Sequence, residues 1–212
     1  MRKMTTTALY GVLVVFLMMS PLRVLAQDIP LAMVTFTTDG GSLSLQHPEG
    51  WGVEVGAQGS INLANDPALL EAVKEDDFVI AAGQVGLTIV FIPSADAPDM
   101  GIEGETNQER AAFLASLIAP TSEESLVTVG EVELIEHEGQ PMLARVVYGY
   151  GDVYEGMTIV WDIADDAIGV AILMAPPGET APVEETIYAI LGSVEFHSTI
   201  EAVLSGLTEE NE

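Results

Sequence analysis

The stretch that decides the fold is SLSLQHPEGWGVEV, residues 42–55. Its leucines alternate with polar residues ahead of Pro48, a pattern that predicts a strand with one buried side. Pro48 ends this strand because proline has no N–H for a neighbouring strand, and Gly50 lets the chain bend. The chain restarts as a strand just after Trp51, one of two tryptophans. We interpret Trp51 as a packing residue that fills the core at this corner, with stacking on a ligand as the alternative.

Alternating or continuous apolar runs predict further strands on both sides of this corner. The run at 84–92 becomes apolar on both sides near its end, which is typical of a central strand covered on both faces. Four later runs are separated only by short turns and predict an antiparallel meander, in which Trp161 is a core residue. The expected strands are 33–37, 42–47, 60–63, 84–92, 132–136, 142–150, 157–163 and 168–174.

Helix starts are marked by capping residues, and each is followed by apolar residues at helical spacing. Asp66-Pro67 and Pro182 begin two of them, because proline is favoured in the first helical turn. Thr106 with Glu109, and Ser198 with Glu201, form capping boxes. The expected apolar faces are Leu69, Leu70 and Val73; Phe113, Leu114, Leu117 and Ile118; Val183, Ile187, Ile190 and Leu191; and Ile200, Val203, Leu204 and Leu207.

These elements predict an α+β fold, a single-domain α/β/α sandwich with a central, mainly antiparallel sheet and helices on both faces. An all-β sandwich with added helices is the alternative, and the capping boxes argue against it. We expect three segments: 1–26 as a cleaved signal peptide, 27–197 as the sandwich domain, and 198–212 as a tail helix with an acidic end.

The first residues have the three parts of a secretory signal. Arg2 and Lys3 precede an apolar run over residues 8–19, and Val24-Leu25-Ala26 places small or β-branched residues at the cleavage site, so we expect cleavage between Ala26 and Gln27. The run is shorter than the ~20 residues that span a bilayer as a helix. We therefore expect a secreted, extracytoplasmic protein that is not inserted in the membrane; an uncleaved membrane anchor is the alternative.

The composition narrows the function classes. The absence of cysteine excludes disulfides, thiolate metal sites and cysteine nucleophiles. Beyond residue 26, Lys74, Arg110 and Arg145 face 33 acidic residues, a net charge of −30. Nucleic-acid binding needs basic residues that displace counterions, so this charge argues against it. We interpret the acidity as a soluble surface suited to salty or acidic surroundings; a surface for cations or a basic partner is the alternative.

Motifs of known catalytic chemistry are missing from the sequence: there is no Gly-x-Ser-x-Gly, P-loop or His-Glu-x-x-His pattern. Gly149-Tyr150-Gly151 lies between two expected antiparallel strands, so it predicts a turn rather than a dinucleotide site. His47, His137 and His197 are far apart in the sequence and lie near strand ends, which favours packing or surface roles.

One acidic loop has the composition of a calcium site, because flexible oxygen-rich loops suit that ion. It contains Asp96, Asp99, Glu103 and Glu105 together with Gly101 and Gly104. The spacing does not match an EF-hand, and in a chain this acidic a solvated loop is the simpler interpretation. We therefore predict no catalytic, cofactor-binding or metal-ligating residue.

Three short motifs resemble the PsbP-like group of α/β/α sandwich domains: DGGSLSLQHPEGW (39–51), SINLAND (60–66) and ILGSVEF (190–196). The order of expected elements is also similar over essentially the whole chain after the signal. The resemblance implies a non-catalytic, extracytoplasmic accessory domain; photosynthetic members are extrinsic proteins of photosystem II that help to retain its inorganic ions. This chain lacks their basic docking surface, which argues against a photosystem role. Many bacterial relatives have no assigned role, so no functional residue is carried over.

The sequence thus predicts an exported accessory or binding domain, not an enzyme, whose partner is an unknown protein or small ligand. A hydrolase using paired carboxylates and a structural envelope protein are the alternatives, as is an acidic envelope protein that binds divalent cations weakly.

Overall fold

The structure is a computed structural model that describes residues 31–56, 59–72, 79–100, 102–118, 127–137 and 142–210 of the 212-residue chain. From Ala32 onward the chain forms one compact unit. The expected signal segment and its cleavage site after Ala26 lie outside the described residues. Among the described helices, none combines the length and apolar character needed to cross a membrane.

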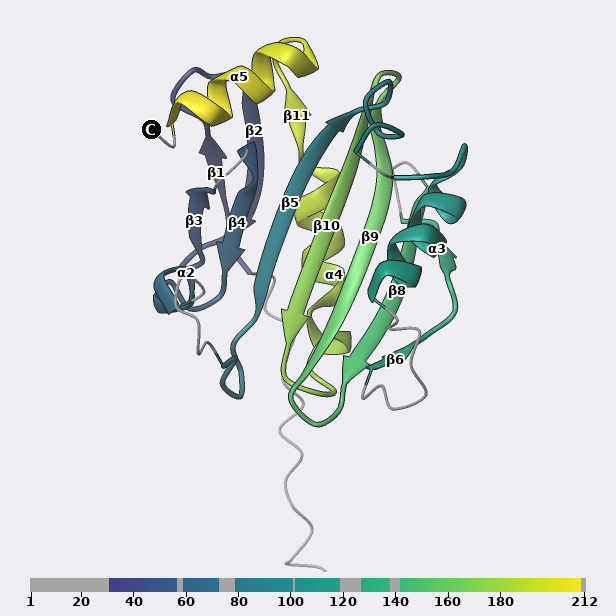
Figure 1. The fold of residues 1–212 in the computed structure, drawn as a ribbon. Coiled ribbons are helices and arrows are strands. Elements are labelled where there is room, and N and C mark those ends of the chain that lie inside the picture. The colour runs from purple at the N-terminus through teal and green to yellow at the C-terminus, as the bar shows by residue number, and fades with distance from the viewer. Residues whose placement is uncertain are drawn as a thin grey trace, which may run out of the picture. The chain divides into compact units, whose positions relative to one another are not determined.

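The described strands form two antiparallel sheets (Figure 1). The smaller sheet has the order β1 (Met33–Thr37), β2 (Leu43–Pro48), β11 (Glu195–Phe196). The larger sheet has the order β3 (Gly52–Val55), β4 (Ile61–Ala64), β5 (Gly86–Pro93), β10 (Ala167–Ala175), β9 (Tyr154–Ala164), β8 (Leu143–Tyr150), β6 (Val127–Val129), and β7 (Glu133–Ile135) also pairs with β8. The predicted four-run meander is confirmed as β7, β8, β9 and β10, each paired antiparallel with the next.

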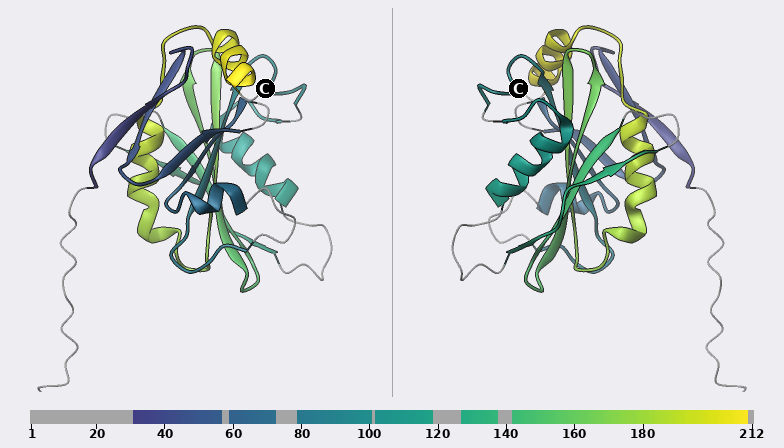
Figure 2. Two further views of the ribbon diagram at one scale, coloured as in Figure 1. Left: turned by 90° about the vertical axis from the view of Figure 1, so that its left-hand side faces the viewer. Right: turned by 90° about the vertical axis from the view of Figure 1, so that its right-hand side faces the viewer.

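Helices lie on both faces of the larger sheet (Figure 2), which confirms the α+β fold class. One face carries α4 (Glu184–Gly192), which follows a short 3-10 turn, η2 (Ala181–Val183). The opposite face carries α3 (Asn107–Ile118) and the short α2 (Ala68–Ala72). The last helix, α5 (Ile200–Glu210), buries Ile200, Val203 and Leu207 in the main core, so the predicted tail helix packs on the domain.

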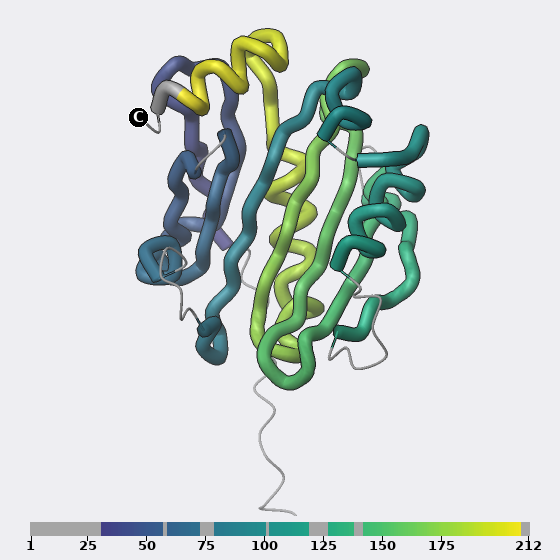
Figure 3. Tube along the Cα trace, viewed as in Figure 1, coloured from purple at the N-terminus to yellow at the C-terminus, as the bar shows by residue number. Residues whose placement is uncertain are grey.

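The corner at residues 48–51 separates the two sheets, a feature that the sequence did not predict. The N–H of Trp51 donates to the carbonyl of Pro48 at 3.1 Å, and Gly50 has φ +91°, a conformation that favours glycine. Figure 3 traces the chain from β2 in the smaller sheet to β3 in the larger one. Trp51 is half-buried against the main core, as its packing interpretation requires.

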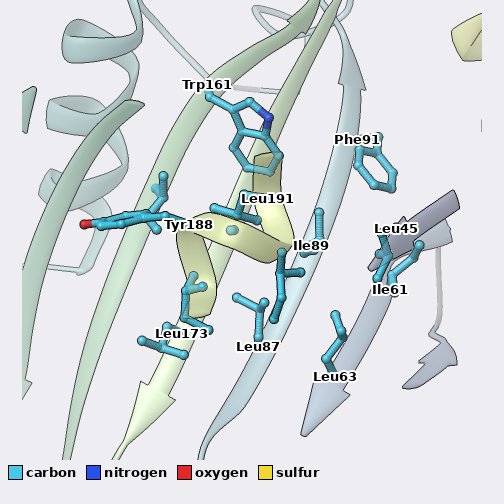
Figure 4. Packing of buried hydrophobic residues seen from close by; sticks show 14 of the residues in the cluster. Leu45, Ile61, Leu63, Leu87, Ile89, Phe91, Trp161, Leu173, Tyr188 and Leu191 are labelled. Atoms are coloured by element: carbon cyan, nitrogen blue, oxygen red, sulfur yellow. The ribbon is translucent and has the colours of Figure 1, made fainter. Parts of the chain in front are cut away.

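Successive residues of the central strands point to opposite faces of the larger sheet. On β9, Ile159 and Trp161 belong to the main core beneath α4, whereas Val160 belongs to a second, smaller cluster beneath α3. Figure 4 shows the main core, where Trp161 is 2% exposed and lies among leucines and isoleucines of several strands. Its ring covers Gly169 of β10, where an added Cβ would approach the ring to 2.4 Å.

The helix starts are as predicted, with one shift. At α3 the capping box is confirmed: the N–H of Glu109 donates to Thr106 Oγ1 at 3.2 Å, and the N–H of Thr106 donates to Glu109 Oε2 at 3.0 Å. At α5 the predicted cap, Ser198, is wrong by one residue. The cap is Thr199, whose Oγ1 accepts from the N–H of Ala202 at 3.4 Å.

The predicted apolar face of α3 is partly wrong. Ala111 and Ala115 are the buried residues, whereas Leu117 is 66% exposed and Phe113 is only half-buried. Small side chains allow the helix to approach β8 and β9 closely, and Leu114 of the predicted face also packs against the smaller cluster. At α2, Leu69 is buried and Leu70 half-buried, and Val73 lies outside the described residues.

Candidate functional site

The acidic loop does not assemble a metal cage in the part of the chain that the structure describes. No three His, Cys, Asp or Glu side chains gather there in a way that could hold an ion. Ala97 and Ile102 instead anchor the loop in the smaller core cluster, and the N–H of Ile102 donates to the carbonyl of Ala97 at 2.8 Å. Gly104 lets the chain pass close to Glu109 at the start of α3, and Gly101 lies outside the described residues.

The three histidines lie apart, each with its own neighbour. His47 is buried and its Nδ1 lies 3.0 Å from the carbonyl oxygen of Pro48. His197 Nε2 lies 2.8 Å from Ser44 Oγ, across the β2–β11 pair. His137 packs beside the ring of Tyr188, with ring centroids 5.6 Å apart. The structure therefore does not bring the three histidines together.

The predicted turn lies at the tip of the β8–β9 hairpin, where Gly149 and Tyr150 are the last residues of β8 and Gly151 begins the turn. Tyr150 and Tyr154 stack there, with ring centroids 5.5 Å apart and an interplanar angle of 15°. Val153 is 53% exposed at this tip. The segment is therefore a hairpin end, and it offers no helix N-terminus to a phosphate.

The feature that sequence reasoning missed is a strip of sheet between α2 and α3. In Figure 1, β5 and β10 face the viewer between these two helices, and no described helix lies in front of them. Helix α2 packs on β3 and β4, and α3 packs on β8 and β9. The strip residues are Thr88 and Val90 on β5 and Ile172 and Met174 on β10; we call these four residues the open face.

The open face is flanked at one end by an apolar pocket under α2. The pocket is open to solvent on one side. Leu69 and Leu70 of α2, Ile80, and Met174 of β10 contribute its apolar walls, and Glu54 and Thr88 add polar groups. A mainly apolar hollow with few polar groups is the usual form of a binding pocket for an apolar side chain or a small ligand.

At the other end lies a polar hollow that opens to solvent, beside the first turns of α3. The Arg110 side chain, 14% exposed, donates from Nη1 to Asn107 Oδ1 at 3.0 Å and lies 3.5 Å from Asp162 Oδ1. Its buried Nε has no hydrogen-bond partner. Glu105 and Asp165 complete the rim and are exposed, so the hollow carries three carboxylates against one guanidinium.

A second arginine cluster lies on the α4 side, where Arg145 contacts two carboxylates and a tyrosine hydroxyl. Arg145 donates from Nε and Nη2 to Glu133 Oε2 at 3.0 and 2.7 Å, and from Nη1 to the Tyr188 hydroxyl at 2.9 Å. Its Nη1 also lies 2.6 Å from Glu184 Oε2. Burial opposes the guanidinium charge, but the two carboxylates outweigh it and raise the pKa of Arg145. This cluster joins β7, β8 and α4 through the Arg145 side chain.

The carboxyl groups with clearly shifted pKa values have hydrogen-bond donors beside them. The pKa of Asp66 is lowered by the Gln84 side chain and the N–H of Ala68. The pKa of Glu109 is lowered by backbone N–H groups of Thr106 and Glu105. At the start of α5, the pKa of Glu201 is lowered by its own backbone N–H and by the Thr199 side chain. A general acid needs a shift in the opposite direction, so these three carboxyls have the properties of helix caps.

Comparisons with known proteins give a fold and no family. No family model matches the chain, and no curated protein matches it. The structure of the Ran-binding protein Mog1p from Saccharomyces cerevisiae aligns with a TM-score of 0.51 at 10% identity, covering 82% of this chain and 98% of that one. The described chain therefore has the Mog1/PsbP-like α+β fold.

Two other solved structures align over most of their length at lower scores. The solution structure of cyanobacterial PsbP (CyanoP) from Synechocystis has a TM-score of 0.46 at 14% identity, covering 84% of this chain and 99% of that one. A mutant of the protein Mog1 has a TM-score of 0.47 at 12% identity, covering 80% of this chain and 98% of that one. Identities this low give the fold alone and carry no information on function.

Proposed function

We propose that the mature chain is an exported, non-catalytic accessory domain that binds a partner through the open face. The observation that carries the proposal is the unequal cover of the two faces of the larger sheet. Ile172 of β10 is 36% exposed on the α3 side, whereas the next residue, Leu173, is fully buried on the α4 side. An apolar strip with a pocket at one end and a charged hollow at the other suits recognition of a partner.

The enzyme alternative, a carboxylate hydrolase, has less support. Retaining or inverting hydrolases need one carboxyl with a raised pKa beside an ionised one. Among the described residues, the carboxyls whose pKa values clearly shift are Asp66, Glu109 and Glu201, and all three pKa values are lowered. Turnover of an ester, glycoside or phosphate substrate, lost on changing a single Asp or Glu, would favour the hydrolase over our proposal.

Site-specific crosslinking in the native host tests the binding role. A photoreactive amino acid replaces Ile172 on the open face, and the matched control replaces Val153, an exposed apolar residue at the β8–β9 tip. We expect a discrete crosslinked species from position 172 that is missing at position 153. Equal crosslinking at both positions, or none at position 172, would contradict a docking role for the open face.

Export is tested separately, by mass spectrometry of the protein purified from its host. We expect Gln27 to be the first residue of the mature chain and the protein to be found outside the cytoplasm. An intact N-terminus in the membrane fraction would support the anchored alternative.

A further inference from the structure

The space above the open face has the width of one helix. Neighbouring strands lie about 4.8 Å apart, and four such spacings separate the pair β3–β4 under α2 from the pair β9–β8 under α3. Measured across the strands, the two helices are therefore about 19 Å apart. Packed helices lie about 8–10 Å apart, so one further helix fits midway, above β5 and β10.

The surface below this space suits the apolar side of a helix. Val90, Ile172 and Met174 supply aliphatic and thioether groups, and Met174 also lines the pocket under α2. The Thr88 hydroxyl donates to Asn62 Oδ1 at 3.0 Å, so its donor is already satisfied within the chain and does not need a partner on a bound helix. An apolar stripe laid along this strip would remove Ile172 from water.

The charges around the strip favour a basic occupant. Glu54 lines the pocket at one end, and Glu105, Asp162 and Asp165 line the hollow at the other. The two ends are linked along β5 and the residue after it by the seven residues from Thr88 to Ser94, which span about 20 Å in an extended chain. About 13 residues of helix cover this distance. A second copy is disfavoured as the occupant, because each mature chain carries a charge of −30 and copies repel one another.

We propose that the open face binds a cationic amphipathic helix of a partner protein. This inference rests on the proposed binding function and adds the chemistry of the partner. The apolar stripe of the helix lies on Ile172 and Met174 with one large side chain in the pocket under α2. Lysine or arginine side chains at its other end meet Glu105, Asp162 and Asp165.

Three synthetic peptides of about 14 residues test this chemistry. The first carries leucines at helical spacing and lysines on the other side; the second has the same composition in an order that destroys the stripe. The third keeps the stripe but has glutamate in place of lysine. Each is titrated into the mature protein by fluorescence anisotropy at about 0.15 M salt, so that long-range attraction is screened.

We expect the first peptide to bind with a micromolar Kd and the other two at least tenfold more weakly. Ile172→Asp should weaken the first peptide at least tenfold, and the control Val153→Asp should change it less than twofold. Glu105→Gln combined with Asp165→Asn should weaken binding and reduce its salt dependence. Circular dichroism establishes whether each variant is folded. If Ile172→Asp does not fold, Ile172→Thr serves as a milder substitution.

Each other outcome has a defined meaning. If the scrambled peptide binds as well as the first, or if Ile172→Asp and Ile172→Thr bind like the wild type, the interaction is diffuse charge attraction and the inference is wrong. If the acidic peptide binds better, and Ile172→Asp abolishes that binding, the open face is a docking site but its partner is not basic. A dimer in sedimentation equilibrium that Ile172→Asp dissociates would make a second copy the occupant and overturn the inference.

Discussion

The two faces of the larger sheet are built from the same strands but are covered differently. On the α4 side, the strands, α4, α5 and the smaller sheet bury one continuous core, whose leucines and isoleucines have almost no exposure (Figure 4). On the α3 side, a smaller cluster around Val160, Ile168 and Ala111 lies under one helix, and β5 and β10 continue beyond it. The stability of this domain should therefore come mainly from the α4 face, which leaves the α3 face available for binding.

Neighbouring residues of β10 give the largest expected contrast. Leu173 is fully buried on the α4 side, so Leu173→Ala should cost about 2–5 kcal/mol of unfolding free energy through lost burial and a cavity. Ile172 is 36% exposed on the α3 side, so Ile172→Ala should cost roughly 1 kcal/mol or less. Urea unfolding followed by circular dichroism measures both. Equal losses of unfolding free energy in the two variants would contradict the proposed difference between the two faces.

The two arginine clusters give the next contrast. Arg145→Ala removes the donor shared by Glu133, Glu184 and Tyr188, and should cost about 1–3 kcal/mol. Arg110→Ala loses one good hydrogen bond, to Asn107, and should cost about 1 kcal/mol or less. Thermal unfolding of the two variants measures this difference. A larger loss for Arg110 would mean that the polar hollow stabilises the fold and is not poised for a ligand.

A substitution in the capping box of α3 should have the smallest effect on the free energy of unfolding, and that effect should depend on pH. Folding lowers the pKa of Glu109 from its ordinary value of 4.5, so its stabilising contribution is complete at neutral pH and is lost as the pH falls through the lowered value. Glu109→Gln should therefore be less stable than the wild type at about pH 7, and the difference should shrink at about pH 3. Chemical unfolding at both values tests this. A difference that stays constant with pH would contradict the capping role.

Local patterns predicted the elements well, because their causes lie in neighbouring residues. The alternation before Pro48, the capping box at Thr106 and the short turns of the meander each depend on a few adjacent side chains. The separate smaller sheet was not predicted because β11 is only two residues long. Its residue Phe196 pairs with Leu43, which lies near the other end of the described chain. No local pattern of so short a segment signals its pairing.

The open face could not be predicted for a different reason. The open face is exposed because no described helix packs on it. That depends on where α2 and α3 pack, and the residues of β5 and β10 do not determine it. The sequence did contain one sign of it, since Ala111 and Ala115 lie on one side of α3 while Leu117 lies on the other. If these alanines mark the contact surface of α3, the helix packs over β8 and β9 and leaves β5 and β10 without a helix on that face.

Methyl NMR during titration with the cationic amphipathic peptide tests the central claim most directly. Ile172 on the open face and Ile159 in the main core serve as paired reporters, because they lie on neighbouring paired strands but face opposite sides of the sheet. We predict saturable shifts and peptide contacts at the Ile172 and Met174 methyl groups, with Ile159 unchanged. Peptide contacts confined to other surfaces, or no change at Ile172 at saturating peptide, would contradict the account.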